Sequence, residues 1–285
     1  MPWITRGLRN GVVTSRWPRR SDDYFDTFSA AVDIDPDPPV LALETVDGIE
    51  QLCPTGAITL DRGANGDRTS GPHQVRLDRG RCILCGRCVE HRPDLFFWAP
   101  GSDIARHQRD QLVVGSVPGT DDNLADVQAE LARRVTALRR SVHIRHVDVG
   151  SDGSDEWEIQ ALTNPVYDLH RLGIFFTASP RHADILLVTG IGAAGMWAPL
   201  RRTREAMPDP VVVIAAGVEA ASGGALHTSY IGRGGIGEIL DVDIWVAGSP
   251  ASPFSLLHAI LLALGRLPAA RSHPARILDP VEGDG

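Results

Sequence analysis

The sequence predicts an α+β domain that carries all the cysteines, followed by an α/β domain with a parallel sheet. In the second half, runs of Val, Ile and Leu that end in glycine recur at 183–190 (ADILLVTG), 211–217 (VVVIAAG) and 242–248 (VDIWVAG). Segments of helical pattern lie between and after these runs. Uninterrupted apolar strands are typical of a parallel sheet that is covered on both faces. The four cysteines lie earlier, between residues 53 and 88.

The composition limits the class of protein. The chain has 285 residues, 43% of them hydrophobic, which suits two domains of about 100–200 residues each. Its net charge of −8 argues against nucleic acid as a partner. All 28 basic residues are arginine, which excludes a catalytic lysine. We expect a cytoplasmic protein, because the sequence shows neither a bilayer span nor the apolar region of a signal peptide.

The cysteine spacing predicts one [4Fe–4S] cluster. Cys82, Cys85 and Cys88 form C-x2-C-x2-C, and the remote Cys53 is followed by proline. Three ligands from one tight loop and a fourth from a Cys-Pro pair are typical of a bacterial ferredoxin. Zinc sites more often use two separated C-x2-C pairs. Zinc and unligated thiols remain alternatives.

The spacing also indicates that the second cluster of a two-cluster ferredoxin is absent, because all four of its cysteine ligands are missing. In two-cluster ferredoxins, the last cysteine of each run binds the other cluster. The same spacing in this chain places the missing ligands at Leu43, Val46, Ile49 and Arg92. We therefore expect the three aliphatic side chains to be buried where an inorganic core once lay.

The rest of the chain divides around these motifs. We expect an extended arm at 1–40, the cluster domain at 41–115, a linking helix at 116–145 and the α/β domain at 146–285. In the linking helix, apolar residues recur at helical spacing, and the other face carries Arg133, Arg134, Arg139 and Arg140. This basic face is either solvated or a docking surface for an acidic partner.

A glycine motif favours a different function. Gly190, Gly192 and Gly195 form G-x-G-x-x-G directly after an expected strand, and Glu219 follows the next strand. Such an acidic residue binds the ribose in dinucleotide-binding folds. A soluble NAD-binding oxidoreductase is therefore an alternative, although Pro199 lies near the expected helix start.

Longer stretches resemble known families. Roughly residues 1–115, including GLRNGVVTSRWPRR, resemble the ferredoxin-like subunit of formate-hydrogenlyase-type complexes. About residues 146–265 resemble the small subunit of energy-converting [NiFe]-hydrogenases and the related 20 kDa subunit of complex I, through EIQALTNPVYDLHRLGIFFTASPRHADILLVTG, REAMPDPVVVIAAG and VDIWVAGSPASP. This second resemblance implies a flavodoxin-like fold that holds the [4Fe–4S] cluster nearest the catalytic or quinone site.

The chain departs from that family at the cluster ligands. The positions of the four family cysteines correspond to Asp152, Asp155, Glu219 and Ser249. Thiolates hold cubane iron, whereas carboxylates suit harder ions, so we expect this proximal cluster to be absent. We expect the four side chains to share one pocket, either as polar filling or as a divalent-ion site.

Together these features predict an iron–sulfur electron-transfer subunit of a hydrogenase-related or complex I-like assembly. The resemblance implies a large-subunit (complex I 49 kDa-like) partner and membrane-arm subunits, hence a peripheral position on the cytoplasmic face of the membrane. We expect an oxidoreductase subunit without catalytic residues of its own rather than a stand-alone enzyme. A non-redox structural or assembly subunit is the other alternative.

Overall fold

The computed structural model describes residues 2–36, 48–61, 74–115, 124–135, 141–226 and 229–267. Its N-terminal part contains two small antiparallel sheets. One pairs β1 (Ala31–Ile34) with β4 (Phe96–Ala99). The other has the order β2 (Ile58–Asp61), β3 (Gln74–Asp78), β5 (Val113–Val114). Short helices accompany them: α4 (Ile49–Leu52), α5 (Arg87–His91) and the 3-10 turn η1 (Asp110–Leu112). The antiparallel sheets support the predicted α+β part.

The C-terminal part is built on a parallel sheet of five strands, which confirms the predicted α/β domain. The spatial order is β10-β9-β8-β6-β7. The strands are β6 (Val142–Asp148), β7 (Ile174–Phe176), β8 (Ile185–Thr189), β9 (Val212–Ala216) and β10 (Ile244–Val246). Counted from β6, this is the 2-1-3-4-5 order of flavodoxin-like folds. Every residue of β8 and β9 is buried, as their continuous apolar sequences require.

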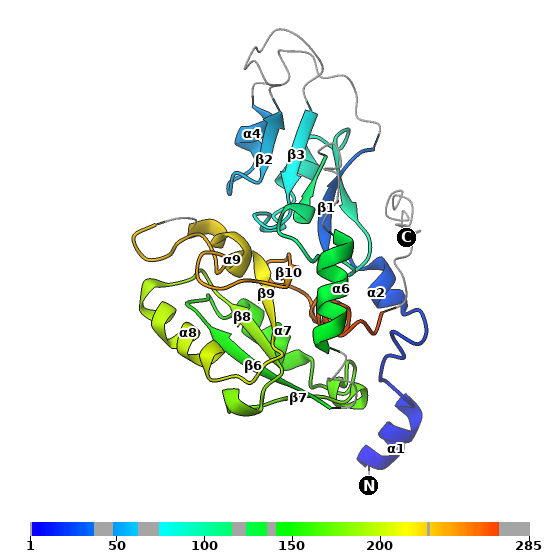
Figure 1. Cartoon of the computed structure of the whole chain (residues 1–285). Helices are drawn as coiled ribbons and strands as arrows, with labels where there is room; N and C mark the ends of the chain where they lie inside the picture. The colour runs from blue at the N-terminus through cyan, green and yellow to red at the C-terminus, as the bar shows by residue number, and fades with distance from the viewer. Residues whose placement is uncertain are drawn as a thin grey trace.

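Helices cover both faces of this sheet (Figure 1). α7 (Ser154–Ala161) and α10 (Pro253–Ala263) pack against each other, whereas α8 (Trp197–Glu205) and α9 (Gly217–Ser222) lie on the other side. The 3-10 turns are η2 (Leu169–Leu172), η3 (Pro180–His182), η4 (Ala194–Met196) and η5 (Gly224–Leu226). The sequence of α10 is apolar around most of the helix, and nine of its eleven residues are buried.

The first 36 residues are not extended throughout, in contrast to the expected arm. They form α1 (Pro2–Asn10) and α2 (Asp23–Thr27), and then contribute β1 to the N-terminal sheet. Trp17 stacks on Phe25 with ring centroids 4.5 Å apart, and both rings meet Phe254 of α10 edge-on. Aromatic burial therefore folds the segment after α1 onto the C-terminal domain.

The linking helix is α6 (Leu124–Val135). Its described part is shorter than the expected range 116–145. Leu131 and Val135 are buried in the core of the C-terminal domain. Arg134 forms an ion pair with Asp243 and donates to the carbonyl of Val211. Arg134 therefore fixes α6 to the sheet rather than offering its charge to a partner. Arg133 is exposed beside Glu130, and Arg139 and Arg140 lie outside the described residues.

The expected filling of the lost ferredoxin cluster can be followed at one position. Ile49 is 2% exposed and belongs to the N-terminal core, with Ile58, Leu95 and Phe96. Leu43 and Val46 lie outside the described residues. The aliphatic residue at position 49 therefore packs the interior of the N-terminal domain.

Truncation of this side chain should destabilise the N-terminal domain. Ile49→Ala leaves a cavity, and we expect the free energy of unfolding to fall by about 2–5 kcal/mol. Urea unfolding followed by tryptophan fluorescence measures the loss, since Trp98 packs against the same core. Val166→Ala, at a side chain that is 42% exposed, is the control. An equally small effect of both substitutions would contradict the assigned packing.

Candidate functional site

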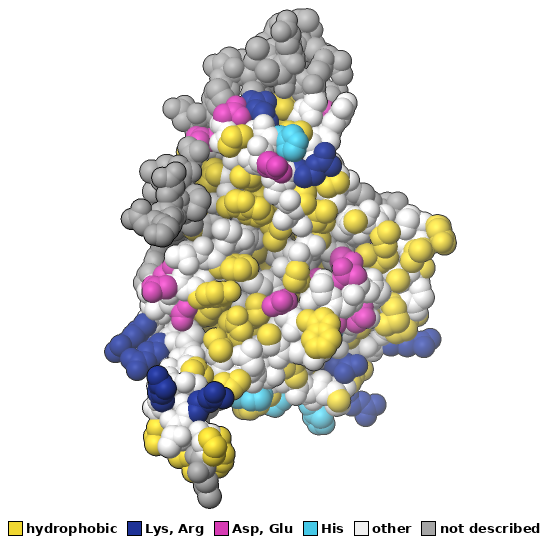
Figure 2. Space-filling view, turned by 180° about the vertical axis from the view of Figure 1, so that it is seen from behind, with side chains coloured by type: hydrophobic (Ala, Val, Ile, Leu, Met, Phe, Trp, Pro, Cys, Tyr) yellow, Lys and Arg dark blue, Asp and Glu magenta, His cyan; other side chains and the backbone are white. Residues whose placement is uncertain are grey.

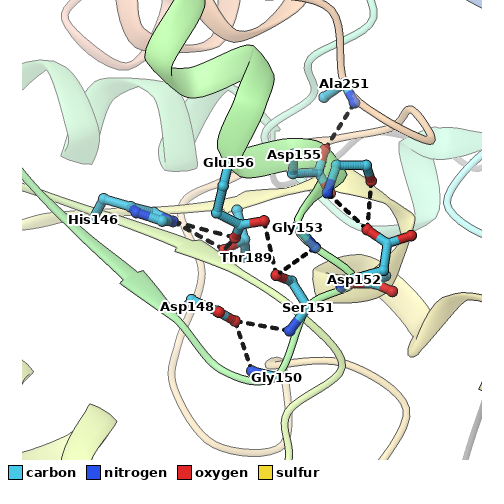
Figure 3. Close-up of polar contacts among 12 residues, drawn as sticks. His146, Asp148, Gly150, Ser151, Asp152, Gly153, Asp155, Glu156, Thr189 and Ala251 are labelled. Carbon is cyan, nitrogen blue, oxygen red and sulfur yellow. Dashed lines mark hydrogen bonds and ion pairs between the residues drawn. The ribbon is translucent and has the colours of Figure 1, made fainter.

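The candidate site lies where the chain leaves the central strands of the parallel sheet. β6 and β8 are adjacent and parallel, with Asp148 opposite Thr189 at their carboxyl ends. The strands that follow them in sequence lie on opposite sides of this pair. Ligands of open α/β sheets bind at such a switch point, outside the carboxyl ends of the strands. The side chains of this region are drawn in Figure 3.

The loop after β6 is held by its own polar side chains. Asp148 Oδ1 accepts the N–H groups of Gly150 and Ser151, both at 2.8 Å. Asp152 Oδ1 then accepts the N–H of Ser154 at 2.9 Å and its hydroxyl at 2.6 Å. Asp and Asn side chains form Asx turns of this kind. Asp148 and Asp152 therefore favour a tight entry into α7.

Asp155 lies in the first turn of α7 and is the buried member of the site. It is 3% exposed, and its Oδ1 accepts the N–H of Ala251 at 2.8 Å. The other carboxylate oxygen lies against Gly217, where a Cβ would overlap it. Gly217 also has φ +83°, so glycine serves both the backbone and the close approach. Asp155 therefore joins α7 to the starts of α9 and the segment after β10.

The other residues of the degenerate cluster site approach Asp155 from three segments. Glu219, on α9, accepts the N–H of Asp152 through Oε2 at 3.2 Å. Ser249 follows β10, and its peptide bond to Pro250 is cis. Its neighbour Gly248 accepts the N–H of Val218, the residue before Glu219. The structure therefore brings Asp152, Asp155 and Glu219 into mutual range and places the backbone of Ser249 beside them.

Burial and mutual repulsion keep protons on this site. Burial raises the pKa of Asp155 to about 7, and the charges of Glu156, Glu219 and Asp152 add to the rise. Burial also raises the pKa of Glu219 to about 7, and Asp152 again contributes. The N–H donors of Ala251 and Asp152 oppose these shifts without cancelling them. Two carboxyl groups of the site therefore titrate near neutral pH.

A hydrogen-bonded chain of four side chains, which sequence reasoning missed, borders the carboxyl groups. Thr189 donates its hydroxyl proton to Glu156, so the 2.9 Å contact between Thr189 Oγ1 and His146 Nε2 requires the imidazole to donate. Ser151 donates to the other oxygen of Glu156 at 2.8 Å. Burial lowers the pKa of His146, although the carboxylate of Glu156 opposes the shift. No sequence pattern marks this chain of side chains, because its members lie on elements that only the fold brings together.

The four cysteines come together in the N-terminal domain. Cys82 and Cys88 are buried in its core, and Cys53 packs against them. All four are free thiols. Cys53 Sγ accepts the N–H of Ala57 at 3.2 Å and lies 3.4 Å from Thr55 Oγ1. Remote segments of the sequence thus meet as the ferredoxin pattern requires.

The chemistry of these thiols fits a metal–thiolate centre. Burial raises the pKa of Cys82 to about 12, and the thiols of Cys88, Cys53 and Cys85 add to the rise. The backbone N–H of Leu84 opposes it. Metal ligation requires the deprotonated thiolate, and a bound metal centre would offset the charge of thiolates that raise one another's pKa. This fit concerns the chemistry of the donors and not their geometry, because within the described parts of the chain no three His, Cys, Asp or Glu side chains are grouped so as to hold a metal ion.

Two arginines lie close to the cysteines in sequence, Arg87 and Arg92. Arg92 makes a two-pronged ion pair with Asp94, through hydrogen bonds of 2.8 and 2.7 Å. The carboxylate of Asp94 therefore offsets the positive charge of Arg92. Arg87 begins α5, between Cys85 and Cys88 in sequence.

The glycine motif after β8 is explained by contacts within the protein. Gly190 and Gly192 both have positive φ. A Cβ at Gly190 would lie 2.8 Å from the backbone of Gly150 and Ser151, and one at Gly192 would overlap the carbonyl of Gly235. The motif also follows the third strand of the domain rather than the first, where the dinucleotide fingerprint lies. Gly190 and Gly192 therefore let loops pack closely and need no nucleotide to explain them, whereas a Cβ at Gly195 would meet open space.

A cavity of about 570 Å³ lies where the two domains meet. On the N-terminal side, Arg109 pairs with Asp78 through contacts of 2.7 and 2.8 Å. The same side chain donates to the carbonyl of Ala221, on the helix that carries Glu219. The cavity is lined by Asp78, Arg81, Arg109, Asp110, Val113, Ala221, Ser222 and Gly234. Arg109 therefore connects the strand before the cysteine loop to the carboxylate site.

The fold and the site define a flavodoxin-like α/β domain with a loop-built site at its switch point, joined to a cysteine-rich domain. A sequence model of the NADH ubiquinone oxidoreductase 20 kDa subunit matches residues 153–263. A probable membrane-bound hydrogenase subunit of Pyrococcus furiosus is 36% identical over 141 residues, which cover 50% of this chain and 84% of that protein. The chain belongs to the family of the NADH ubiquinone oxidoreductase 20 kDa subunit.

Other similarities extend over part of the chain. Formate hydrogenlyase subunit 7 of Escherichia coli is 38% identical over 152 residues, which cover 53% of this chain and 58% of that protein. The chain thus spans less than two thirds of the length of this relative. A chain in the structure of an archaeal membrane-bound sulfane sulfur reductase, a respiratory membrane complex, has 28% identity and a TM-score of 0.41. That similarity covers 46% of this chain and 74% of the other.

The raised pKa of Asp155 predicts how stability depends on pH. The folded chain keeps this proton until about pH 7, whereas an exposed Asp loses it near pH 4. The folded state therefore binds more protons between these values, and the free energy of unfolding falls as pH rises from about 4 to about 7. Asp155→Asn keeps an oxygen for the Ala251 N–H and removes the charge, so it should stabilise the protein by about 1–3 kcal/mol at pH 8.

Urea unfolding at pH 5 and pH 8 measures this effect. The gain should be smaller at pH 5, where the carboxyl group of the folded parent is neutral and only the unfolded chain has lost the proton. Asp209→Asn, at a side chain that is 81% exposed, should change stability little at either pH. A loss of stability in Asp155→Asn of equal size at both pH values would show that the carboxylate is ionised and needed.

Proposed function

We propose that this chain is an electron-transfer subunit of a hydrogenase-related or complex I-like membrane-associated complex. It would carry one [4Fe–4S] cluster on Cys53, Cys82, Cys85 and Cys88. The single observation that supports the proposal is that Cys53, from a remote segment, packs against the core that contains Cys82 and Cys88, and that Cys85 is near enough to act on the pKa of Cys82. When bound, the cluster supplies one-electron transfer, and the protein positions and tunes it.

The surroundings of the thiols support the assignment of a redox centre. Backbone N–H groups of Ala57 and Leu84 face the sulfurs of Cys53 and Cys82. Hydrogen bonds to cluster sulfurs and burial are two of the factors that set the reduction potential of such clusters. The N-terminal domain would therefore be ferredoxin-like, with the second cluster of that fold replaced by packed side chains such as Ile49.

The C-terminal domain would serve as the family's small-subunit scaffold without its own cluster. Asp152, Asp155 and Glu219 bring carboxylates where the resemblance places thiolates. Carboxyl groups that keep protons near neutral pH are poor ligands for cubane iron. An electron on the N-terminal cluster would then have no second station in this chain, and its acceptor would lie on another subunit.

The partners follow from the relatives rather than from the chain itself. Two relatives are named as subunits of formate hydrogenlyase and of a membrane-bound hydrogenase. We therefore propose a large-subunit homologue (complex I 49 kDa-like) and membrane-arm subunits as partners, and a peripheral position on the cytoplasmic face. In the described residues, no helix has the length and apolar character of a membrane span.

Metal and sulfide content tests the proposal. The anaerobically purified chain should contain about four iron and four sulfide atoms. Cys85→Ser removes an exposed thiol from the ligand set, so iron should fall strongly and visible absorption near 400 nm should be lost. Analysis by mass spectrometry of metals and by sulfide assay checks both results.

Ser154→Cys is the matched control. It exchanges the same two residue types in the opposite direction, and it lies outside the N-terminal domain. This substitution should leave the iron content unchanged. Stoichiometric zinc would replace the redox assignment with a structural zinc site. About eight iron atoms per chain would show that the second domain still holds a cluster.

A further inference from the structure

The helix α1 presents an apolar face that the described residues leave exposed. All of its nine residues, Pro2–Asn10, are exposed, with Trp3 at 72% and Leu8 at 79%. Val12 follows the helix and is 81% exposed. Large apolar side chains exposed next to one another mark an interaction surface. They do not contribute to the core.

The side chains of α1 are separated by type around the helix axis. At about 100° per residue, Trp3, Ile4, Gly7 and Leu8 fall within an arc of about 140°. The opposite arc contains Thr5, Arg6, Arg9 and Asn10. The helix is therefore apolar on one side and basic on the other.

The local charge around α1 is opposite to that of the chain. Residues 1–21 contain five arginines, and the first acidic residue is Asp22. The whole chain has a net charge of −8. The arginines are Arg6, Arg9, Arg16, Arg19 and Arg20. This segment is complementary to a negatively charged surface.

The segment that follows α1 fixes it to the body of the protein. Thr14 donates to the carbonyl of Pro165 at 2.7 Å, and Ser15 donates its N–H to the carbonyl of Val166 at 2.8 Å. Arg171 donates to the carbonyl of Trp17. α1 projects beyond these contacts (Figure 1), with hydrophobic and basic side chains side by side at the projecting end (Figure 2).

The dimensions of α1 favour a lipid surface over a protein partner. A nine-residue helix is about 14 Å long and about 10 Å wide. Its face is far smaller than the roughly 800 Å² per partner of a standard protein interface. An interfacial helix needs only to bury its apolar face while its basic residues meet anionic headgroups. Tryptophan among the apolar residues also suits the interface.

We propose that α1 binds the surface of an anionic membrane directly, with Trp3, Ile4 and Leu8 inserted and Arg6 and Arg9 against phosphate groups. This goes beyond the proposed function, in which partner subunits alone provide the membrane contact. One short helix gives weak binding, so it would orient the chain within a complex that other subunits hold at the membrane.

Flotation of the full chain with phosphatidylglycerol-containing vesicles tests the proposal. The parent should float with these vesicles, and not with vesicles of phosphatidylcholine alone. Binding should weaken as salt rises, because headgroup attraction is screened. Leu8→Glu should lower the partition coefficient about tenfold or more, since it removes a large inserted side chain.

Asn10→Glu is the matched control, since it adds the same charge on the polar arc; it should reduce binding far less than Leu8→Glu. Both variants should unfold at the parent's temperature, because α1 buries no residue. Equal binding of the parent and Leu8→Glu would overturn the proposal. The proposal would also be overturned if the parent formed a dimer that Leu8→Glu dissociates and did not bind vesicles. It would be overturned too if the parent floated only when membrane-arm subunits were present. The iron content of Leu8→Glu should equal that of the parent, which separates this test from that of the electron-transfer function.

Discussion

The parallel pairing of β6 with β8 is the constraint on which the site depends. It places Asp148 opposite Thr189, so the loop into α7 and the glycine loop emerge side by side. The close backbone approach at Gly190 follows from the same pairing. Because β9 and β10 continue the sheet from β8, their following segments bring Glu219 to Asp152 and Ala251 to Asp155. A buried sheet thus determines the positions of polar residues that no short-range pattern brings together.

In the proposed account, the two domains have different roles. The N-terminal domain gathers thiols, and the C-terminal domain gathers carboxyl groups that keep protons near neutral pH. Arg109 contacts Asp78 near the cysteine loop and Ala221 on α9, so it joins the two sites mechanically. Backbone hydrogen bonds between Arg106 and Trp245 add a second connection, at 2.8 and 2.7 Å.

Sequence reasoning found the parts of the structure that follow from regular patterns. Apolar runs predicted β8, β9 and β10, and helical spacing predicted α6, because burial alone decides those positions. The folded segment around Trp17 was missed, since its contacts with Phe25 and Phe254 depend on tertiary packing. The role of Arg134 was missed for the same reason: its partner Asp243 is far away in sequence. The hydrogen-bonded side chains of His146, Thr189, Glu156 and Ser151 were not predicted, because they lie on different elements. The glycine motif was ambiguous, since close packing of loops and nucleotide binding both require glycine.

A reductive titration of the anaerobic full chain, with quantitation of its electron paramagnetic resonance signal, tests the central claim most directly. The claim is that one redox centre exists in this chain and lies in the N-terminal domain. The account predicts about one electron taken up and one spin per chain, both lost in Cys53→Ser and both retained in Asp155→Asn. Two interacting spins, or a signal that survives Cys53→Ser and disappears in Asp155→Asn, would contradict it.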